Sequence, residues 1–325
     1  RGSAAEFERR AANTKPLLGD ICMAGQATVL YAPPNAGKTL ITLRLTADAV
    51  AEQRIAAGNV YYINADDGAR GLAEKMHIMD ELGAHTLVPG FKGFNAPDLI
   101  GLLRRAIELD AAMDTLVIID TLKKFAQLMD KKLSAEFANV CRQYVMRGGA
   151  VVALAHTTKS PNSDGSLRYG GTTDFLEDFD AAYVMKPLSA SADAGEKVVQ
   201  FDLQKRRGDN PETVGYAYAG ETGISYDERI ASVRPVDLTQ LDAFRKVGER
   251  IDDGVVIEAI RERILAGEGG AKMTLARSAA KACGVTERAA VAVLDRYTGT
   301  DRGTHQWTFV PGERTSRRYE LLSTG

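Results

Sequence analysis

The feature that most constrains this chain is a short loop between a strand-like run and a helix-like run. The loop, Ala32-Pro-Pro-Asn-Ala-Gly-Lys-Thr39, follows the apolar run 27–31 and precedes the apolar, helix-like run 40–45. This layout binds nucleotide phosphates, because backbone N–H groups of the loop and the positive end of the helix face the anionic oxygens. We therefore predict that the chain binds a nucleoside triphosphate, ATP, together with Mg²⁺.

Within the loop, Lys38 is placed to reach the β- and γ-phosphates and the Thr39 hydroxyl to ligate Mg²⁺. Ala32 stands where the usual motif has its first glycine. Alanine is the mildest replacement, and two prolines pre-set φ in the loop, so we expect the geometry to survive. The alternative is a chance Gly-Lys-Thr, which the flanking strand and helix disfavour. The predicted nucleotide contacts are Pro34, Asn35, Ala36, Gly37, Lys38, Thr39 and Leu40.

Composition limits the other functions that the chain could have. With 325 residues and a net charge of −2, overall charge gives no reason to expect nucleic acid, so any such surface must be local. Its three cysteines have neither disulfide nor zinc spacing and fit a reducing cytoplasm. No apolar run approaches ~20 residues, so we expect no membrane span. Residues 1–14 open with Arg-Gly-Ser and are expected to be a tag or N-terminal remnant.

Residues 15–230 alternate strand-like and helical runs, which predicts an α/β domain with a mainly parallel sheet flanked by helices. Ser134 is expected to cap a helix that ends at Gly148, and another helix is expected to stop at Gly83. The last three predicted strands have no long helix between them, which favours antiparallel strands at one sheet edge. The predicted strands are 27–31, 59–63, 115–120, 150–155, 181–185, 197–202 and 213–218.

The pattern weakens over 231–250, where we place a linker, and 251–325 forms a second domain. Three helices followed by two strands are expected there, the outline of a small winged helix-turn-helix domain. Between Lys272 and Arg318 the chain has nine Lys/Arg and four Asp/Glu. Arg288 on the third helix and Arg317 near the wing are therefore candidate DNA contacts, with protein interaction as the alternative.

Three carboxylates lie at or just after the ends of two predicted strands, where the ligands of open α/β sheets collect. Asp120 ends an apolar strand and with Thr39 could hold Mg²⁺, although a capping Asp is the alternative. Asp66 is our first choice, and Asp67 the second, for orienting and deprotonating the water that attacks the γ-phosphate. Solvated turn residues are the competing interpretation of that pair.

Three further groups of polar residues are candidates. His156 follows a strand and could hydrogen-bond the γ-phosphate, although a lone histidine is more often structural. Lys205, Arg206 and Arg207 are either solvated or, in a ring ATPase, reach the neighbouring subunit's site as arginine fingers do. In the polar loop 157–173, Lys159 and Arg168 could contact a nucleic-acid backbone; plain flexibility is the alternative.

Together these elements resemble the RecA-type ATPase family, in particular the hexameric replicative helicases of the RepA and DnaB kind. The matching pieces are Ala32–Thr39, Tyr62–Asp67, Ile118–Leu122, Ala153–Thr157 and Leu203–Gly208, in the family's order over about 200 residues. The resemblance implies a RecA-like P-loop ATPase domain over 15–230, with Asp120 on the metal and His156 as γ-phosphate sensor. It also implies trans-acting cations among residues 205–207.

The resemblance further implies that loops near 121–133 and 157–173 face a channel that holds single-stranded DNA, which adds Lys123 and Lys124 to the candidate contacts. Two departures are visible. Relatives usually place glutamate where Asp66 stands, and a relative's K-x-R-x-G spacing would put Gln204 and Arg206 in the finger roles.

The preferred hypothesis is a cytoplasmic DNA helicase that forms a homo-oligomeric ring, a hexamer by the resemblance. It would translocate on single-stranded or forked DNA in a plasmid, phage or mobile-element replication system, and replication-initiation proteins would then be further partners. The rival is an ATP-switched DNA-binding or regulatory ATPase of the KaiC-like kind, without unwinding. A strand-exchange filament is less favoured, because no obvious polymerisation segment is seen.

Overall fold

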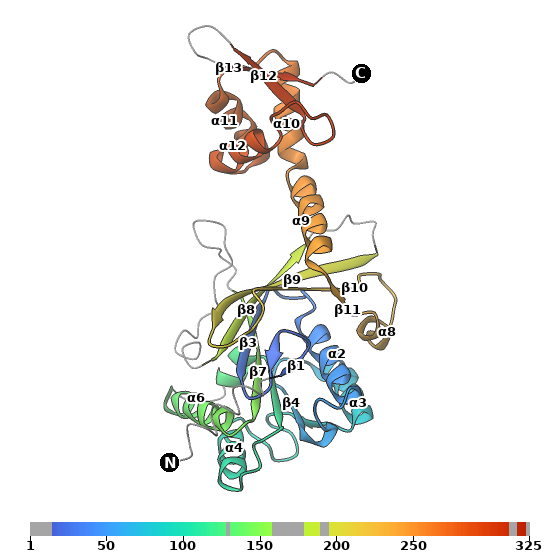
Figure 1. Ribbon diagram of the computed structural model, residues 1–325, viewed down its shortest axis with the longest axis vertical. Helices are drawn as coiled ribbons and strands as arrows, with labels where there is room; N and C mark the ends of the chain where they lie inside the picture. Colours follow the sequence, from blue (N-terminus) through green and yellow to red (C-terminus); the bar gives the residue numbers. More distant parts are fainter. Residues whose placement is uncertain (1–14, 128–130, 158–178, 189–194, 312–316, 323–325) are drawn as a thin grey trace. The chain divides into compact units, whose positions relative to one another are not determined.

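The computed structural model describes residues 15–127, 131–157, 179–188, 195–311 and 317–322 (Figure 1). The chain forms two compact units, one up to Ala243 and one from Phe244 onward, and each is described by itself.

The first unit is built on a nine-stranded sheet in the order β11-β10-β9-β8-β3-β7-β6-β4-β5. The strands from β8 to β5 in that order run parallel, whereas β9, β10 and β11 add antiparallel strands at one edge. The predicted fold class is therefore confirmed. The bounds are β3 Ala27–Ala32, β4 Val60–Asn64, β5 His85–Leu87, β6 Leu116–Asp120, β7 Ala150–His156, β8 Ala181–Leu188, β9 Glu196–Arg206, β10 Thr213–Ala219 and β11 Arg234–Val236.

The central strands of this sheet are apolar on both faces, and helices therefore cover both faces and bury them. Side chains alternate along β3, so that Leu30 joins one buried cluster while Val29 and Tyr31 join the other. The first cluster is completed by α2 (Lys38–Ala51) and α3 (Ala69–Leu82), and the second by α4 (Asp98–Glu108) and α6 (Lys131–Met146). Figure 1 shows the two helix pairs on opposite faces.

Several elements differ from the sequence-based expectation. Ser134 is wrong as a helix cap, because α6 begins at Lys131 and Ser134 lies inside it. Leu133 packs against the buried cluster and so favours a helix that starts one turn earlier. Short elements were not predicted: β1 (Pro16–Leu18), β2 (Cys22–Met23), the 3-10 turn Ala57–Asn59, β5, α5 (Leu122–Gln127) and α8 (Tyr226–Ala231). The 11-residue helix α4 was also missed, although Leu99, Ile100 and Leu103 give it a clear apolar face.

The stretch 231–250, predicted as a linker, contains regular structure. β11 pairs with β10, and α9 (Leu238–Asp252) follows it. Leu241 is fully buried against Gly215, where a Cβ would lie 2.7 Å from the leucine side chain. Of the described residues of this stretch only Val233, Val236 and Leu241 are buried, while apolar Leu238 is exposed, which explains why the hydrophobic pattern was too weak to reveal the strand and helix.

The second unit holds α10 (Gly254–Leu265), α11 (Lys272–Cys283) and α12 (Glu287–Arg296), followed by β12 (Trp307–Pro311) and β13 (Arg317–Leu321). The two strands pair antiparallel. Trp307 is fully buried in a core shared by the three helices, and its indole N–H donates to the Leu294 carbonyl at 3.0 Å. The predicted order of elements is confirmed, while the winged-helix assignment stays a prediction.

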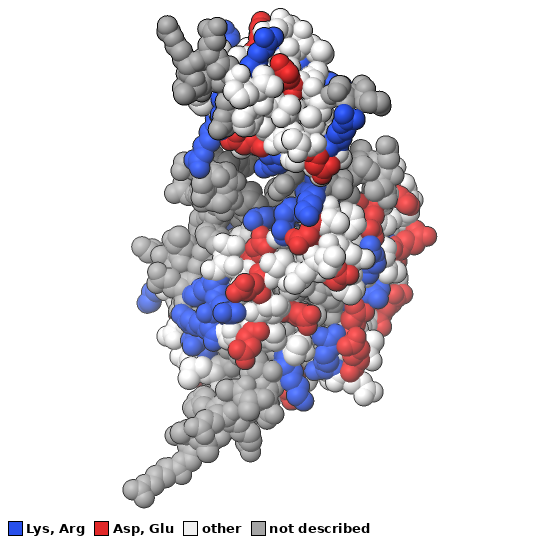
Figure 2. Space-filling model, turned by 45° about the horizontal axis from the view of Figure 1, so that its top comes forward, with Lys and Arg blue, Asp and Glu red and all other residues white. Residues whose placement is uncertain are grey.

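Charges of both signs are distributed over the surface. On the face shown in Figure 2, Lys and Arg are interspersed with Asp and Glu, as expected for a net charge of −2. None of the helices in the described ranges combines the length and the apolar character needed to cross a membrane.

Candidate nucleotide-binding site

The loop after β3 has the backbone shape that phosphate binding requires. Gly37 stands at the N-cap of α2 with φ of 85°, in the left-handed region that favours glycine. A Cβ there would lie 2.7 Å from ring atoms of Tyr218, so a side chain is excluded on steric grounds as well. Ala32 is the last residue of β3, in extended backbone that any residue adopts, which explains why alanine is tolerated at the first glycine position.

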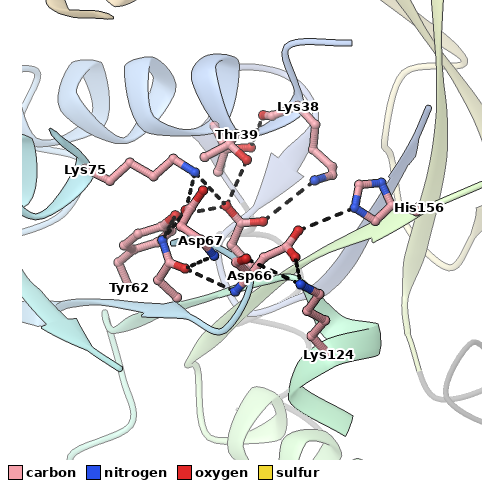
Figure 3. A network of polar contacts seen from close by, with 11 residues as sticks. Lys38, Thr39, Tyr62, Asp66, Asp67, Lys75, Lys124 and His156 are labelled. Carbon is pink, nitrogen blue, oxygen red and sulfur yellow. Dashed lines mark hydrogen bonds and ion pairs between the residues drawn. The ribbon is translucent and has the colours of Figure 1, made fainter. Parts of the chain in front are cut away.

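Lys38 and Thr39 open α2 and point at Asp120, which ends β6 (Figure 3). The Thr39 hydroxyl donates to Asp120 Oδ2 at 2.8 Å, and Lys38 Nζ lies 3.7 Å from Asp120 Oδ1. Burial lowers the pKa of the Lys38 ammonium, and the charge of Asp120 opposes that change. The structure thus brings together the three residues that the sequence assigned to phosphates and metal.

Asp120 is buried and accepts a further hydrogen bond from the Tyr62 hydroxyl at 2.9 Å. Burial, followed by the Asp120 charge, raises the pKa of Tyr62 well above its ordinary value, so this hydroxyl remains a donor. Lys75 Nζ from α3 lies 3.9 Å from the same carboxylate oxygen. The carboxylate is therefore held by two hydroxyl donors, Thr39 and Tyr62, and by two ammonium groups, and these four groups come from three different elements.

Asp66 faces the cavity from the turn after β4. Its carboxylate lies 2.7 Å from Lys124 Nζ on α5 and 3.6 Å from His156 Nε2 at the end of β7. Burial acts to raise the pKa of Asp66, but the contacts with Lys124 and His156 outweigh it and hold the pKa below its ordinary value. Figure 3 shows these side chains converging from the carboxyl ends of two strands and from α5.

Asp67 is held differently from its neighbour. It pairs with the Lys75 ammonium and accepts a hydrogen bond from Asn64 Nδ2 at 2.5 Å. Asn64 Oδ1 in turn accepts from the backbone N–H groups of Asp66 and Asp67, at 3.2 and 3.1 Å. Asn64 therefore shapes the turn, and of the two carboxylates Asp66 is the one that contacts His156.

One cavity of about 530 Å³ is lined by the loop residues 35–40 together with Asp66, Asp67, Lys75, Asp120 and His156. The sequence analysis missed several residues of the site. Tyr62 and Asn64 alternate with core residues on β4, a strand-period signal that could have revealed them, whereas charges on α3 and α8 look like ordinary solvated positions. The missed residues are Tyr62, Asn64, Lys75, Lys197, Tyr218, Tyr226 and Arg229.

The donor set fits Mg²⁺ bound together with a nucleotide. Thr39 and Asp120 would offer a hydroxyl and a carboxylate oxygen, the hard ligands that Mg²⁺ prefers. Among the described residues, no group of three or more His, Cys, Asp or Glu could hold a metal ion alone, so phosphate and water oxygens would complete the shell. When bound, Mg²⁺ supplies positive charge that neutralises the phosphates.

The cationic cluster Lys205, Arg206 and Arg207 lies away from this cavity. Lys197, near the start of β9, lines the cavity, whereas the cluster follows eight to ten residues further along the strand, about 26–33 Å away at the usual rise per residue. Arg206 is exposed, and Arg207 Nη1 lies 3.8 Å from Asp180 Oδ1. The structure does not bring these cations to the nucleotide site of their own subunit.

The predicted nucleic-acid contacts have mixed outcomes. Lys123 is exposed on α5, while its neighbour Lys124 is paired with Asp66. Arg288 is exposed on α12. Lys159, Arg168 and the side chain of Arg317 lie outside the described residues.

The exposed acids of α12 are neutralised by α11. Glu287 lies 2.9 Å from Arg277, and Asp295 lies 2.7 Å from Lys272. These pairs leave Arg288 as an exposed cation on this face of α12, although nothing in the structure tests DNA binding there.

The fold and the site define a class, that of P-loop proteins which bind nucleoside triphosphates at the carboxyl ends of a parallel sheet. Residues 2–162 match the family model described as AAA domain. This match covers 161 of the 325 residues and spans the phosphate loop, Asp66, Asp120 and His156, and it supports a P-loop ATPase domain in this part of the chain. No curated protein matches the chain.

Proposed function

We propose that this protein is an ATP-hydrolysing motor that works in a homo-oligomeric ring, as a cytoplasmic helicase that translocates on single-stranded DNA. One observation supports the proposed ring. The arginine-finger candidates 205–207 lie about 26–33 Å along the chain of β9 from Lys197, the β9 residue that lines their own subunit's cavity. Cations at that distance do not reach their own cavity, so a role in hydrolysis would place them at the site of a neighbouring subunit. The resemblance to hexameric helicases gives the expected ring size and the DNA partner.

Within each cavity, Lys38 and the loop N–H groups would hold the β- and γ-phosphates. Asp66 would take a proton from a water molecule as that oxygen bonds to the γ-phosphorus and the bond to the β–γ bridging oxygen breaks. The low pKa of Asp66 keeps it ionised and ready to accept that proton at neutral pH. His156, which already contacts Asp66, would sense the γ-phosphate.

Lys124 supplies a physical link between hydrolysis and DNA. It lies on α5, directly after the metal-binding strand β6, and contacts the catalytic carboxylate. An anionic DNA backbone near α5 would compete with Asp66 for this exposed ammonium. Nucleotide state and DNA contact would then influence each other through one side chain.

A second candidate function is an ATP-switched DNA-binding or regulatory protein. The observation that favours it is the shorter carboxylate: Asp66 occupies the position of a glutamate in relatives, and it is held by Lys124 and His156. A carboxylate that is already paired with two cationic partners would be a less effective base, and ATP hydrolysis would be slow. Slow hydrolysis suits a switch better than a motor.

The test has two stages. Native mass spectrometry with a non-hydrolysable ATP analogue and oligo-dT should show a homo-oligomer of the size of a ring. A strictly monomeric species would refute the ring hypothesis. A fork-unwinding assay with wild-type protein and Lys38→Ala then separates motor from switch. The motor predicts ATP-dependent strand displacement that Lys38→Ala loses, whereas DNA-stimulated hydrolysis without displacement favours the switch.

A further inference from the structure

The cavity has a second wall, formed by residues outside the phosphate loop and outside the strand ends that carry Asp66, Asp120 and His156. It is made by the antiparallel addition to the sheet: Lys197 from β9, Tyr218 from β10, and Tyr226 and Arg229 from α8. Tyr218 packs against Gly37 of the phosphate loop, so this wall adjoins the loop directly.

Arg229 is the residue of this wall whose hydrogen bonding is incomplete. Its Nη2 donates to the Glu221 carbonyl at 2.7 Å, which fixes the guanidinium plane. Its Nε is buried and finds no hydrogen-bond partner within the described part of the chain. A buried donor without a partner is unfavourable, so the guanidinium would gain free energy by shifting to meet an acceptor on a ligand in the cavity.

The helix that carries Arg229 is held firmly beside α2. Ser225 and Glu228 form a capping box, in which the Glu228 N–H donates to the Ser225 hydroxyl at 3.1 Å. Arg44 of α2 donates to the Ala231 carbonyl at 3.1 Å. Since the N-terminus of α2 is the predicted phosphate site and Arg229 lines the same cavity, Arg229 is available to a part of the nucleotide beyond the phosphates.

We propose that Arg229 contacts the nucleoside part of the nucleotide, its guanidinium plane lying against the base and its Nε–H, which lies in that plane, donating to a ribose oxygen. Arginine planes stack on nucleobases in other nucleic-acid sites, and the preset plane would lose little freedom on binding. This inference rests on the proposed nucleotide binding, and it makes Arg229 a specificity residue distinct from the phosphate-binding Lys38.

Titration calorimetry on the full chain tests the proposed contact between Arg229 and the nucleoside. The two probes are ATP and inorganic tripolyphosphate, which has no nucleoside, each with Mg²⁺. Arg229→Gln should weaken ATP binding about tenfold, equivalent to ~1.4 kcal/mol, and leave tripolyphosphate binding unchanged. Equal weakening of both probes would make Arg229 a phosphate ligand and overturn the inference. Unchanged ATP binding would overturn it as well.

Two further variants keep these outcomes distinguishable. Arg234→Gln is the matched control, because Arg234 lies on β11, paired with Glu196 at 2.8 Å and outside the cavity lining, and it should leave both affinities unchanged. Arg229→Lys keeps the charge, removes the plane, and replaces the first variant if Arg229→Gln does not fold. If Lys38→Ala binds both probes as wild type does, the proposed nucleotide site itself fails, whatever Arg229 does.

Discussion

The ammonium of Lys124 binds Asp66 twice, at 2.7 Å from the carboxylate and at 3.4 Å from the backbone carbonyl. It thereby ties α5 to the turn that follows β4. The segment that was predicted as a DNA-facing loop, and that the structure shows as α5, is thus joined by one exposed side chain to the carboxylate predicted to activate water.

Removal of Lys124 should shift the pH dependence of ATP hydrolysis. Burial acts to raise the pKa of Asp66, and Lys124 with His156 holds it below the ordinary value. In Lys124→Ala the pKa of Asp66 rises, the carboxylate becomes protonated at a higher pH, and the acid limb of the rate profile moves to higher pH. Single-turnover rates between about pH 4 and 8, measured without DNA, report the shift.

Lys123→Ala is the matched control for that shift, since Lys123 is the exposed neighbour on α5. Its acid limb should coincide with that of the wild type. A Lys124→Ala profile with an unmoved acid limb would exclude Asp66 as the titrating base.

Lys38→Ala should remove most of the affinity for ATP. The lost ammonium would contact two phosphates, and hydrogen bonds to charged groups contribute about 1.5–3 kcal/mol each, so we expect binding at least ~10-fold weaker. Calorimetry with the non-hydrolysable analogue measures this, with Lys281→Ala, at the exposed end of α11, as control. Retained affinity would refute the phosphate assignment.

Gly37→Ala should damage the loop itself. The residue combines φ of 85° with a Tyr218 ring 2.7 Å from any Cβ, and left-handed backbone costs a non-glycine residue about 1–3 kcal/mol. We expect ATP binding to fall at least tenfold. Gly101→Ala in α4 is the control, because a Cβ there meets nothing within 4 Å, and its ATP binding should match that of the wild type.

Deletion of residues 245–325 should leave basal ATP hydrolysis intact. The cavity residues all lie in the first unit, and Leu241, which fills the space over Gly215, is retained. Steady-state hydrolysis without DNA is the measurement. Complete loss of activity in a folded truncated chain would show that the second unit takes part in catalysis.

The parts of the fold that the sequence predicted are those with strong periodic signals. Apolar runs revealed the parallel strands, and polar residues at their ends revealed Asp66, Asp120 and His156, because parallel strands bring their carboxyl ends to one sheet edge. Thr39 and Asp120, 81 positions apart, meet at 2.8 Å for this reason.

The parts that escaped prediction depend on tertiary contacts. Lys75 and Arg229 look like solvated helix charges until α3 and α8 are packed beside the loop. The pairing of Lys124 with Asp66 depends on where α5 follows β6. β11 has three residues, and its pairing with β10 rather than its composition makes it a strand.

The measurement that tests the central claim, hydrolysis at an interface between subunits, is complementation in mixed assemblies. Arg206→Ala or Arg207→Ala should bind ATP and fail to hydrolyse it, whereas Lys38→Ala keeps its own finger. In a 1:1 mixture, roughly a quarter of the interfaces join an intact phosphate loop to an intact finger, and hydrolysis should return to about that fraction of wild type. A mixture of co-assembled variants that stays inactive would contradict trans action, and with it the subunit-interface site.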